Sequence, residues 1–208
     1  MKTVAVAVEI ESLACIRAHR VLFRELGFSV PAGAALCIEG PNGAGKTSLL
    51  RLVAGFLQPA CGTIRIRTET QTLDDAEDRA AFVGWLGHQD AVKPQMSVRE
   101  QLSFAAQLYR APASSGEAME AFGLSALADV PGQFLSAGQK RRVALARLML
   151  CARPLWLLDE PLAALDSTGK KLVAEAIMAH CAVGGIALAA THEPLGIACE
   201  TLRLGAPA

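Results

Sequence analysis

The sequence lacks a net charge, a long apolar run and a paired cysteine motif. Its 20 Lys and Arg residues balance 20 Asp and Glu residues, which argues against a dedicated nucleic-acid binder because such proteins usually carry a net basic face. No apolar run reaches the roughly 18 residues that a membrane-spanning helix needs. Glu9 and Glu11 interrupt the short apolar start of the chain, so we expect no signal peptide. We therefore expect the chain to stay in the cytoplasm unless a partner holds it at a membrane.

The six cysteines are scattered, and none belongs to a Cys-x-x-Cys pair, which excludes the usual zinc and thioredoxin-like patterns. They are Cys15, Cys37, Cys61, Cys151, Cys181 and Cys199. We expect them to be small, reduced, buried apolar residues, as is usual in a reducing cytosol. Charged residues make up only 19% of the 208 residues and hydrophobic residues 52%. This composition predicts a substantial core and a surface that a partner covers in part.

The order of the predicted elements indicates an α/β fold with a parallel sheet. Ile64 and Ile66 alternate with Arg65 and Arg67, a period of two that is typical of half-exposed antiparallel strands. Three other runs are continuously apolar, as in strands buried on both faces: residues 34–38, 155–158 and 186–190. Strands of this kind, separated by helical segments, predict crossover connections within a parallel sheet.

A mostly helical block interrupts these strands in the middle of the chain. Ser97 followed by Glu100 predicts a capping box at the start of its first helix. Residues 117–128 are predicted to form a second helix. A later helix, between the two last buried strands, is expected to have Asp166 or Ser167 as its N-cap.

Residues 40–47 match the pattern G-x-x-x-x-G-K-[ST] between a buried strand and a helix, the context in which this pattern binds phosphate. Its glycines let the backbone wrap closely and point N–H groups at phosphates, and the helix N-terminus adds a positive dipole end. Lys46 is predicted to bridge the β- and γ-phosphates of ATP, and the Thr47 hydroxyl to ligate Mg²⁺. The predicted nucleotide contacts are Gly40, Pro41, Asn42, Gly43, Ala44, Gly45, Lys46, Thr47 and Ser48.

Two carboxylates, Asp159 and Glu160, directly follow the buried strand at 155–158. Strand ends of open α/β sheets point into the ligand crevice. We expect Asp159 to hold the Mg²⁺ shell and Glu160 to polarise the attacking water as general base. Adjacent residues of a strand face opposite ways, which allows the two carboxylates different roles. Such a pair alone is more often a solvated strand end, but the phosphate loop favours the catalytic interpretation.

Ser136 and Gln139 predict a further capping box, at the start of an apolar helix. On spacing alone, an ordinary helix start is favoured over a helix N-terminus that binds an anion. The cationic run Lys140, Arg141 and Arg142 follows at once, and we expect it to form a solvated face.

Six segments together resemble, in order and spacing, the ATPase subunits of ABC transporters. They are the loop at 40–47, Gln89, Leu135-Ser136-Ala137-Gly138-Gln139, the strand and carboxylates at 155–160, Ala164-Leu165-Asp166, and His192. The resemblance covers nearly the whole chain and implies a single ABC ATPase domain over residues 1–208. Such a domain is a P-loop NTPase with a RecA-like core and an N-terminal antiparallel β subdomain (1–89 and 151–208), and with an inserted helical subdomain (about 90–150).

The resemblance also implies a head-to-tail homodimer with two ATP molecules between the subunits. The phosphate loop of one subunit would face a signature segment of the other, namely Ser136, Gly138 and Gln139. Gln89 would sense Mg²⁺ and water, as a metal ligand and a catalytic residue, and would link the site to a membrane partner. His192 would contact the γ-phosphate alongside Lys46 and Glu160, and Asp166 would cross between the two sites.

Two positions depart from the family's pattern. Ala137 stands where the family usually has glycine, so one methyl group crowds the approach to phosphate. Residues 16–19 read Ile-Arg-Ala-His in the region where the family usually has an aromatic that stacks on adenine. Arg17 or His19 is left to stack on the base.

Several segments are similar to the ATP-binding subunits of the cytochrome c maturation (haem exporter) system. They are residues 15–17, 38–42, 86–90, 139–148 and 191–195. The similarity implies two integral-membrane permease subunits of the CcmB type, further cytochrome c maturation proteins, and a peripheral position on the cytoplasmic face of the bacterial inner membrane. Trp85 and Phe104 are candidates for the docking surface, although core packing is the usual fate of such residues. No haem-ligand set is visible, so we expect no direct haem binding, and we expect no nucleic-acid partner.

Two other functions stay open on the sequence. The chain could serve a different exporter, for lipids or drugs, or act as a soluble ABC ATPase on DNA or ribosomes. The second cassette, coiled coil or basic extension that is usual in soluble ABC ATPases is not visible. Glu160 argues against a nucleotide-binding regulator without turnover.

Overall fold

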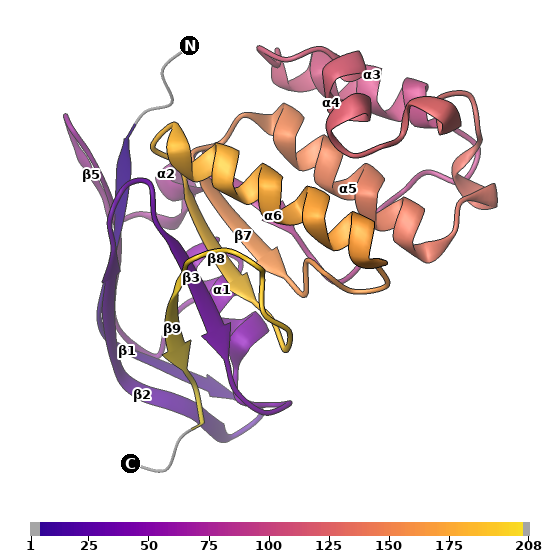
Figure 1. Cartoon of the computed structure of the whole chain (residues 1–208). Helices are drawn as coiled ribbons and strands as arrows, with labels where there is room; N and C mark the ends of the chain where they lie inside the picture. The colour runs from indigo at the N-terminus through magenta and orange to yellow at the C-terminus, as the bar shows by residue number, and fades with distance from the viewer. Residues whose placement is uncertain (1–4, 206–208) are drawn as a thin grey trace.

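The computed structural model describes residues 5–205, which form two sheets and a group of helices (Figure 1). The strands are β1 (Val6–Arg17), β2 (Arg20–Val30), β3 (Ala35–Glu39), β4 (Cys61–Thr68), β5 (Thr72–Leu73), β6 (Val83–Leu86), β7 (Leu155–Asp159), β8 (Ile186–Ala190) and β9 (Glu200–Arg203). The α-helices are α1 (Lys46–Val53), α2 (Ala76–Ala80), α3 (Val98–Tyr109), α4 (Ser115–Ala121), α5 (Ala137–Cys151) and α6 (Ser167–Ala182). Two 3₁₀ turns, η1 (Ser125–Leu127) and η2 (Gly132–Phe134), lie between α4 and α5.

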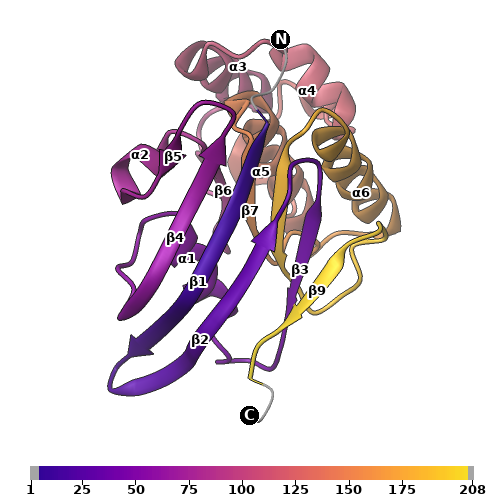
Figure 2. The same cartoon turned by 90° about the vertical axis from the view of Figure 1, so that its left-hand side faces the viewer.

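The first sheet is antiparallel and has the strand order β2-β1-β4-β5, with β4, β1 and β2 side by side in Figure 2. In β4, Ile64 and Ile66 are buried, while Arg65 and Arg67 form ion pairs with acidic residues of β1. The predicted antiparallel strand with one buried face is therefore confirmed.

The second sheet is parallel throughout and has the strand order β6-β7-β8-β3-β9. Every residue of β7 and β8 is buried, as the continuous apolar runs predicted. One face packs against α1 and the antiparallel sheet around a shared core, and the other face packs against α5 and α6 (Figure 1). The α/β class is confirmed, with an antiparallel sheet beside a parallel one.

The helices of the middle block pack together, with α3 and α4 against α5 (Figure 1). Capping boxes open α3 at Ser97 and α5 at Ser136, as predicted, and a further capping box opens α4 at Ser114. The helix predicted over residues 117–128 is wrong in its extent, because α4 ends at Ala121 and Gly123 follows with a φ of 60°. Across residues 5–205, no helix combines the length and the apolar character required to span a membrane.

Asp166 is the N-cap of α6, and its carboxylate accepts a hydrogen bond of 2.7 Å from the Gly169 amide. Near the other end of this helix, His180 stacks on Trp156 of β7, with ring centroids 4.0 Å apart. Burial lowers the pKa of His180 to about 4. The imidazole is therefore neutral at pH 7 and packs, half-buried, between α6 and the sheet.

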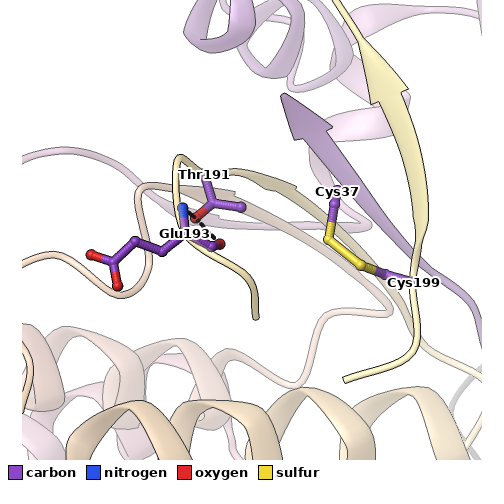
Figure 3. The surroundings of a disulfide bond; sticks show 4 residues. All are labelled: Cys37, Thr191, Glu193 and Cys199. Carbon is purple, nitrogen blue, oxygen red and sulfur yellow. Dashed lines mark hydrogen bonds between the residues drawn. A yellow bond between two sulfur atoms is a disulfide. The ribbon is translucent and has the colours of Figure 1, made fainter. Parts of the chain in front are cut away.

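The expectation of six reduced cysteines is wrong for one pair, because Cys37 and Cys199 form a disulfide (Figure 3). The two residues are 162 positions apart in the sequence, and their Cα atoms are 6.1 Å apart. β3 pairs with β9, and Cys37 lies opposite Thr201 in that pairing. The sheet topology therefore brings Cys199, just before β9, beside Cys37.

We predict that Cys199→Ala lowers the unfolding free energy of the oxidised protein by about 2–4 kcal/mol, because the cross-link restricts the unfolded chain. A urea titration measures the change. Cys61→Ala is the control, since Cys61 is exposed and free, and it should leave the midpoint in place. Alkylation of the denatured, unreduced protein should label the four free cysteines. Labelling of all six would contradict the disulfide.

Candidate active site

A cleft lies at the carboxyl ends of β3, β7 and β8, where the loops that follow these strands meet. Its volume is about 540 Å³, which is in the range of small-molecule binding sites. The lining residues come from the phosphate loop and α1, the segment after β6, the end of β7, the loop after β8 and the β1–β2 hairpin. They are Arg17, Leu22, Pro41, Asn42, Gly43, Gly45, Lys46, Thr47, Ser48, Arg51, His88, Asp159, Glu160 and His192.

The phosphate loop depends on glycine at two positions in particular. Gly40 has a φ of 147°, and a Cβ added there would lie 2.4 Å from the carbonyl oxygen of Leu204. Gly45, the N-cap of α1, has a φ of 102°, and a Cβ there would press against Phe23 and Leu22. Within the described chain, no side chain caps the start of α1, so its first amide groups are available to an anion.

Lys46 is 8% exposed and its ammonium group lies at the centre of the loop. Its Nζ donates hydrogen bonds to the carbonyl oxygens of Gly40 at 2.7 Å and Pro41 at 3.4 Å, and it lies 3.1 Å from Nε2 of His192. A buried ammonium surrounded by loop carbonyls and an imidazole is a concentrated positive charge that can pair with a phosphate.

Thr47 connects the phosphate loop to the end of β7. Its hydroxyl donates to the Asp159 carboxylate, with oxygen–oxygen distances of 2.9 and 3.1 Å. A hydroxyl and a carboxylate that converge in a phosphate-binding cleft form the oxygen donor set that Mg²⁺ uses together with substrate phosphates. These two residues therefore fit a Mg²⁺ ion.

Glu160 follows β7 with a φ of 51°, and its amide donates to the Ala190 carbonyl of β8 at 2.8 Å. The expectation that Asp159 and Glu160 face opposite ways is therefore wrong, because this left-handed residue ends the strand alternation. Both carboxylates line the same cleft. They still have different partners, because Glu160 Oε1 lies 3.3 Å from His192 Nε2.

His192 lies in a tight turn after β8. The Thr191 hydroxyl donates to the carbonyl of Glu193 at 2.8 Å and accepts from the Glu193 amide at 3.1 Å (Figure 3). This turn holds His192 between the ammonium of Lys46 and the carboxylate of Glu160. One imidazole nitrogen therefore contacts both groups.

The structure places the other predicted site residues in different positions. Arg17 lines the cleft beside Leu22, whereas His19 does not, so Arg17 is the better placed of the two to stack on a base. Gln89 is exposed and does not line the cleft, whereas its neighbour His88 does. The sequence did not predict that His88 lines the cleft.

The signature segment forms a second, separate pocket on the same chain. Ser136, Gly138 and Gln139 line it together with Ala164, Leu165 and Asp166. In the capping box, the Ser136 hydroxyl accepts from the main-chain amide of Gln139 at 3.2 Å, and the side-chain Oε1 of Gln139 accepts from the main-chain amide of Ser136 at 2.8 Å. One chain therefore holds the phosphate loop and the signature segment in two different pockets.

Arg141 was missed by the sequence reasoning. It belongs to the cationic run that we expected to be solvated, yet it is only 2% exposed. It lies under the end of β7 and donates to the carbonyl oxygens of Asp159 and Glu160. Its place in a row of three charged residues, 140–142, gave no sign that the middle side chain is buried.

Comparisons with known proteins agree on one family. Residues 23–163 match the family described as ABC transporter. A cytochrome c biogenesis ATP-binding export protein CcmA of Rhodopseudomonas palustris is 48% identical over 94% of this chain and 96% of its own length. The protein of that name from Rhizobium meliloti is 42% identical over 90% and 92%. A solved ABC transporter ATP-binding protein from Pyrococcus furiosus is 24% identical, covers 95% of this chain and 97% of its own, and has a TM-score of 0.80, a similarity of fold.

We predict that Lys46→Ala removes about 3 kcal/mol of transition-state stabilisation, the scale of one oriented donor at a reacting oxyanion. The measurement is kcat/KM for ATP hydrolysis. Lys171→Ala is the control, because the Lys171 side chain is exposed on α6, away from the cleft, where it forms an ion pair with Glu175. Equal kcat/KM values for the two variants would show that Lys46 does not act on the nucleotide.

Proposed function

This chain belongs to the ABC transporter ATP-binding proteins and, among them, to the cytochrome c biogenesis ATP-binding export proteins, and we propose that it powers a membrane complex that handles haem in c-type cytochrome biogenesis. It is an ATPase whose ATP hydrolysis is coupled to transport. The observation that supports this assignment best is the convergence of Lys46, the Thr47–Asp159 pair and the Glu160–His192 pair on one cleft.

Each of these groups has a distinct part in hydrolysis. A water molecule attacks the γ-phosphorus, and the bond from that phosphorus to the β–γ bridging oxygen breaks. Glu160 accepts a proton from the attacking water as general base, while Lys46 stabilises the negative charge on the β- and γ-phosphates. Thr47 and Asp159 would hold Mg²⁺, which neutralises phosphate charge when bound. His192, already beside Lys46 and Glu160, is in place to donate to the γ-phosphate.

The separate signature pocket supports a head-to-tail homodimer as the complete form of the site. In one chain, Ser136 and Gly138 line a pocket that is not the nucleotide cleft. A second copy would bring the N-terminus of its α5 against the nucleotide held by the first. Ala137 adds one methyl group at that helix N-terminus. Asp166 lines the same pocket, at the position from which it would reach the other site.

An exposed apolar surface supports docking of an integral-membrane permease. Phe104 and Leu108, one helical turn apart on α3, are each 61% exposed, so the expectation of core packing is wrong for Phe104. Nearby, Trp85, Tyr109 and Arg147 line a groove beside the edge strand β6. We infer that a short helix of a CcmB-like permease occupies this surface. In that arrangement the chain lies at the cytoplasmic face of the inner membrane, and the block from about residue 90 to 150 acts as a helical subdomain.

The experiment that tests the function is the Glu160→Gln substitution. The amide keeps the size of the carboxylate but cannot accept the proton, so we predict unchanged ATP binding, kcat reduced by at least about 10², and accumulation of an ATP-bound dimer. Phosphate release and size-exclusion chromatography with MgATP measure the two effects. Near wild-type turnover in this variant would remove Glu160 as the base.

For the permease, we predict that Phe104→Asp combined with Leu108→Asp abolishes co-purification with a co-expressed CcmB-like permease and leaves ATP binding intact. Placing a charge in the apolar contact leaves it desolvated and unpaired. Val183→Asp is the matched control, because Val183 is 59% exposed at the end of α6. Retained co-purification of the double variant would place the permease on another surface, and absence of wild-type co-purification would favour a different exporter.

A further inference from the structure

Arg141 uses its whole guanidinium group inside the protein. Nη1 donates to the Gly87 carbonyl and to the Asp90 carboxylate, both at 2.8 Å. Nη2 donates to the carbonyl oxygens of Asp159 and Glu160, both at 2.6 Å, and Nε lies 3.4 Å from the Pro161 carbonyl. All five N–H groups of the guanidinium therefore have an acceptor.

These hydrogen bonds join three parts of the active site. Gly87 and Asp90 flank Gln89, in the segment after β6, and Glu160 carries the predicted general base. Arg141 itself is in the second turn of α5, the helix that begins at the signature segment. Among residues 5–205, no other side chain donates hydrogen bonds to both the segment at 87–90 and the segment at 159–161.

The peptide that Arg141 contacts is strained. Glu160 has a φ of 51°, and a non-glycine residue keeps this conformation only where its surroundings impose it. The Glu160 amide donates to the Ala190 carbonyl of β8, and the Glu160 carbonyl accepts from the Ala163 amide at 3.1 Å and from Arg141. These three contacts on its backbone set the direction of the Glu160 side chain, and Arg141 makes the one side-chain contact among them.

Stability alone does not explain why the Arg141 guanidinium is buried with a single acidic partner. Asp90 is the carboxylate of this set, and the other acceptors are main-chain carbonyls. Removing one partner of a buried ion pair lowers the stability of a protein, but replacing the whole pair by apolar residues often does not. What an apolar or a lysine side chain cannot reproduce is a planar fork that spans two segments at once.

We propose that Arg141 is a positioning residue that holds the Glu160 peptide in its catalytic orientation and ties that orientation to the segment at 87–90. The proposal rests on Glu160 being the base of the proposed ATPase. A displacement of the segment at 87–90, or of α5, moves Arg141 and with it the Glu160 carbonyl.

The test compares Arg141→Lys and Arg141→Gln with the wild type. We expect kcat to fall about a hundredfold in both variants, the effect of moving a catalytic group by about 1 Å. The affinity for a fluorescent ATP analogue should be unchanged, because Arg141 does not line the cleft. Unchanged kcat in Arg141→Lys would overturn the proposal, as would a loss of ATP affinity with kcat retained.

Arg79→Lys is the matched control. Arg79 is a second buried arginine, 5% exposed, in α2 beside the antiparallel sheet. Like Arg141, it donates to main-chain carbonyls, those of Ile64 in β4 and of Asp74. We expect Arg79→Lys to lower the thermal midpoint while kcat per folded molecule stays at the wild-type value. An equal loss of kcat in Arg79→Lys would mean that the effect reflects folding, and would overturn the positioning role.

Asp90→Asn gives a second measurement that does not require replacement of the arginine. It weakens only the ion pair with Arg141, so we expect a smaller loss of kcat, and no further loss when it is added to Arg141→Gln. If the losses of kcat in Asp90→Asn and Arg141→Gln were additive, the two residues would act independently, which would contradict the proposal. Wild-type protein without ATPase activity, or Glu160→Gln with full activity, would instead refute the proposed function. With those two results as expected, the outcome for Arg141→Lys decides this inference alone.

Discussion

The neighbouring positions of β3, β8 and β7 in the parallel sheet decide where every group of the site lies. Ala190 of β8 pairs with Ile38 of β3 on one side and with Asp159 of β7 on the other. The three strands therefore end at one level, and the loops that follow them open into one cleft. A slip of a single residue in this register would turn Asp159 to the opposite face. The buried apolar side chains on both faces of these strands prevent such a slip.

The site at this edge is preorganised by main-chain contacts more than by side-chain packing. Glycine at positions 40 and 45 allows left-handed conformations and close approaches that any side chain would block. Glu160 has a left-handed conformation without being glycine, at a cost on the order of 1–3 kcal/mol. Hydrogen bonds with Ala190, Ala163 and Arg141 hold it there. Catalytic groups that are held before the substrate arrives need no reorganisation during the reaction.

The parts of the fold that depend on residues close together in the sequence could be predicted from it. The phosphate loop, the buried strands and the capping boxes at Ser97 and Ser136 are local patterns, and the structure has the predicted strands and caps. The end of α4 was also readable, since Gly123 is a usual helix stop, but the prediction passed over it.

What could not be read depends on residues far apart in the chain. Arg141 is buried by acceptors 18 to 54 residues away, so nothing in its own segment distinguishes it from a solvated arginine. Cys37 and Cys199 meet across 162 residues because β9 joins the edge of the sheet beside β3. The direction of Glu160 required its φ angle, because alternation along a strand holds only while the strand continues.

The first two turns of α5 contact different parts of the molecule, and this would let a second copy of the chain, in the proposed dimer, act on a base that it does not touch. Its N-terminus lines a surface pocket away from the nucleotide cleft, while Arg141, one turn further along, holds the main chain of the carboxylates in that cleft. Consecutive backbone hydrogen bonds join the first turn of an α-helix to its second. Contact with the N-terminus of α5 is thus mechanically connected to Glu160 through a rigid element and one guanidinium group. The same guanidinium group also holds the segment at 87–90 through Gly87 and Asp90, so this segment and α5 are joined to the main chain of Glu160 by the same few hydrogen bonds.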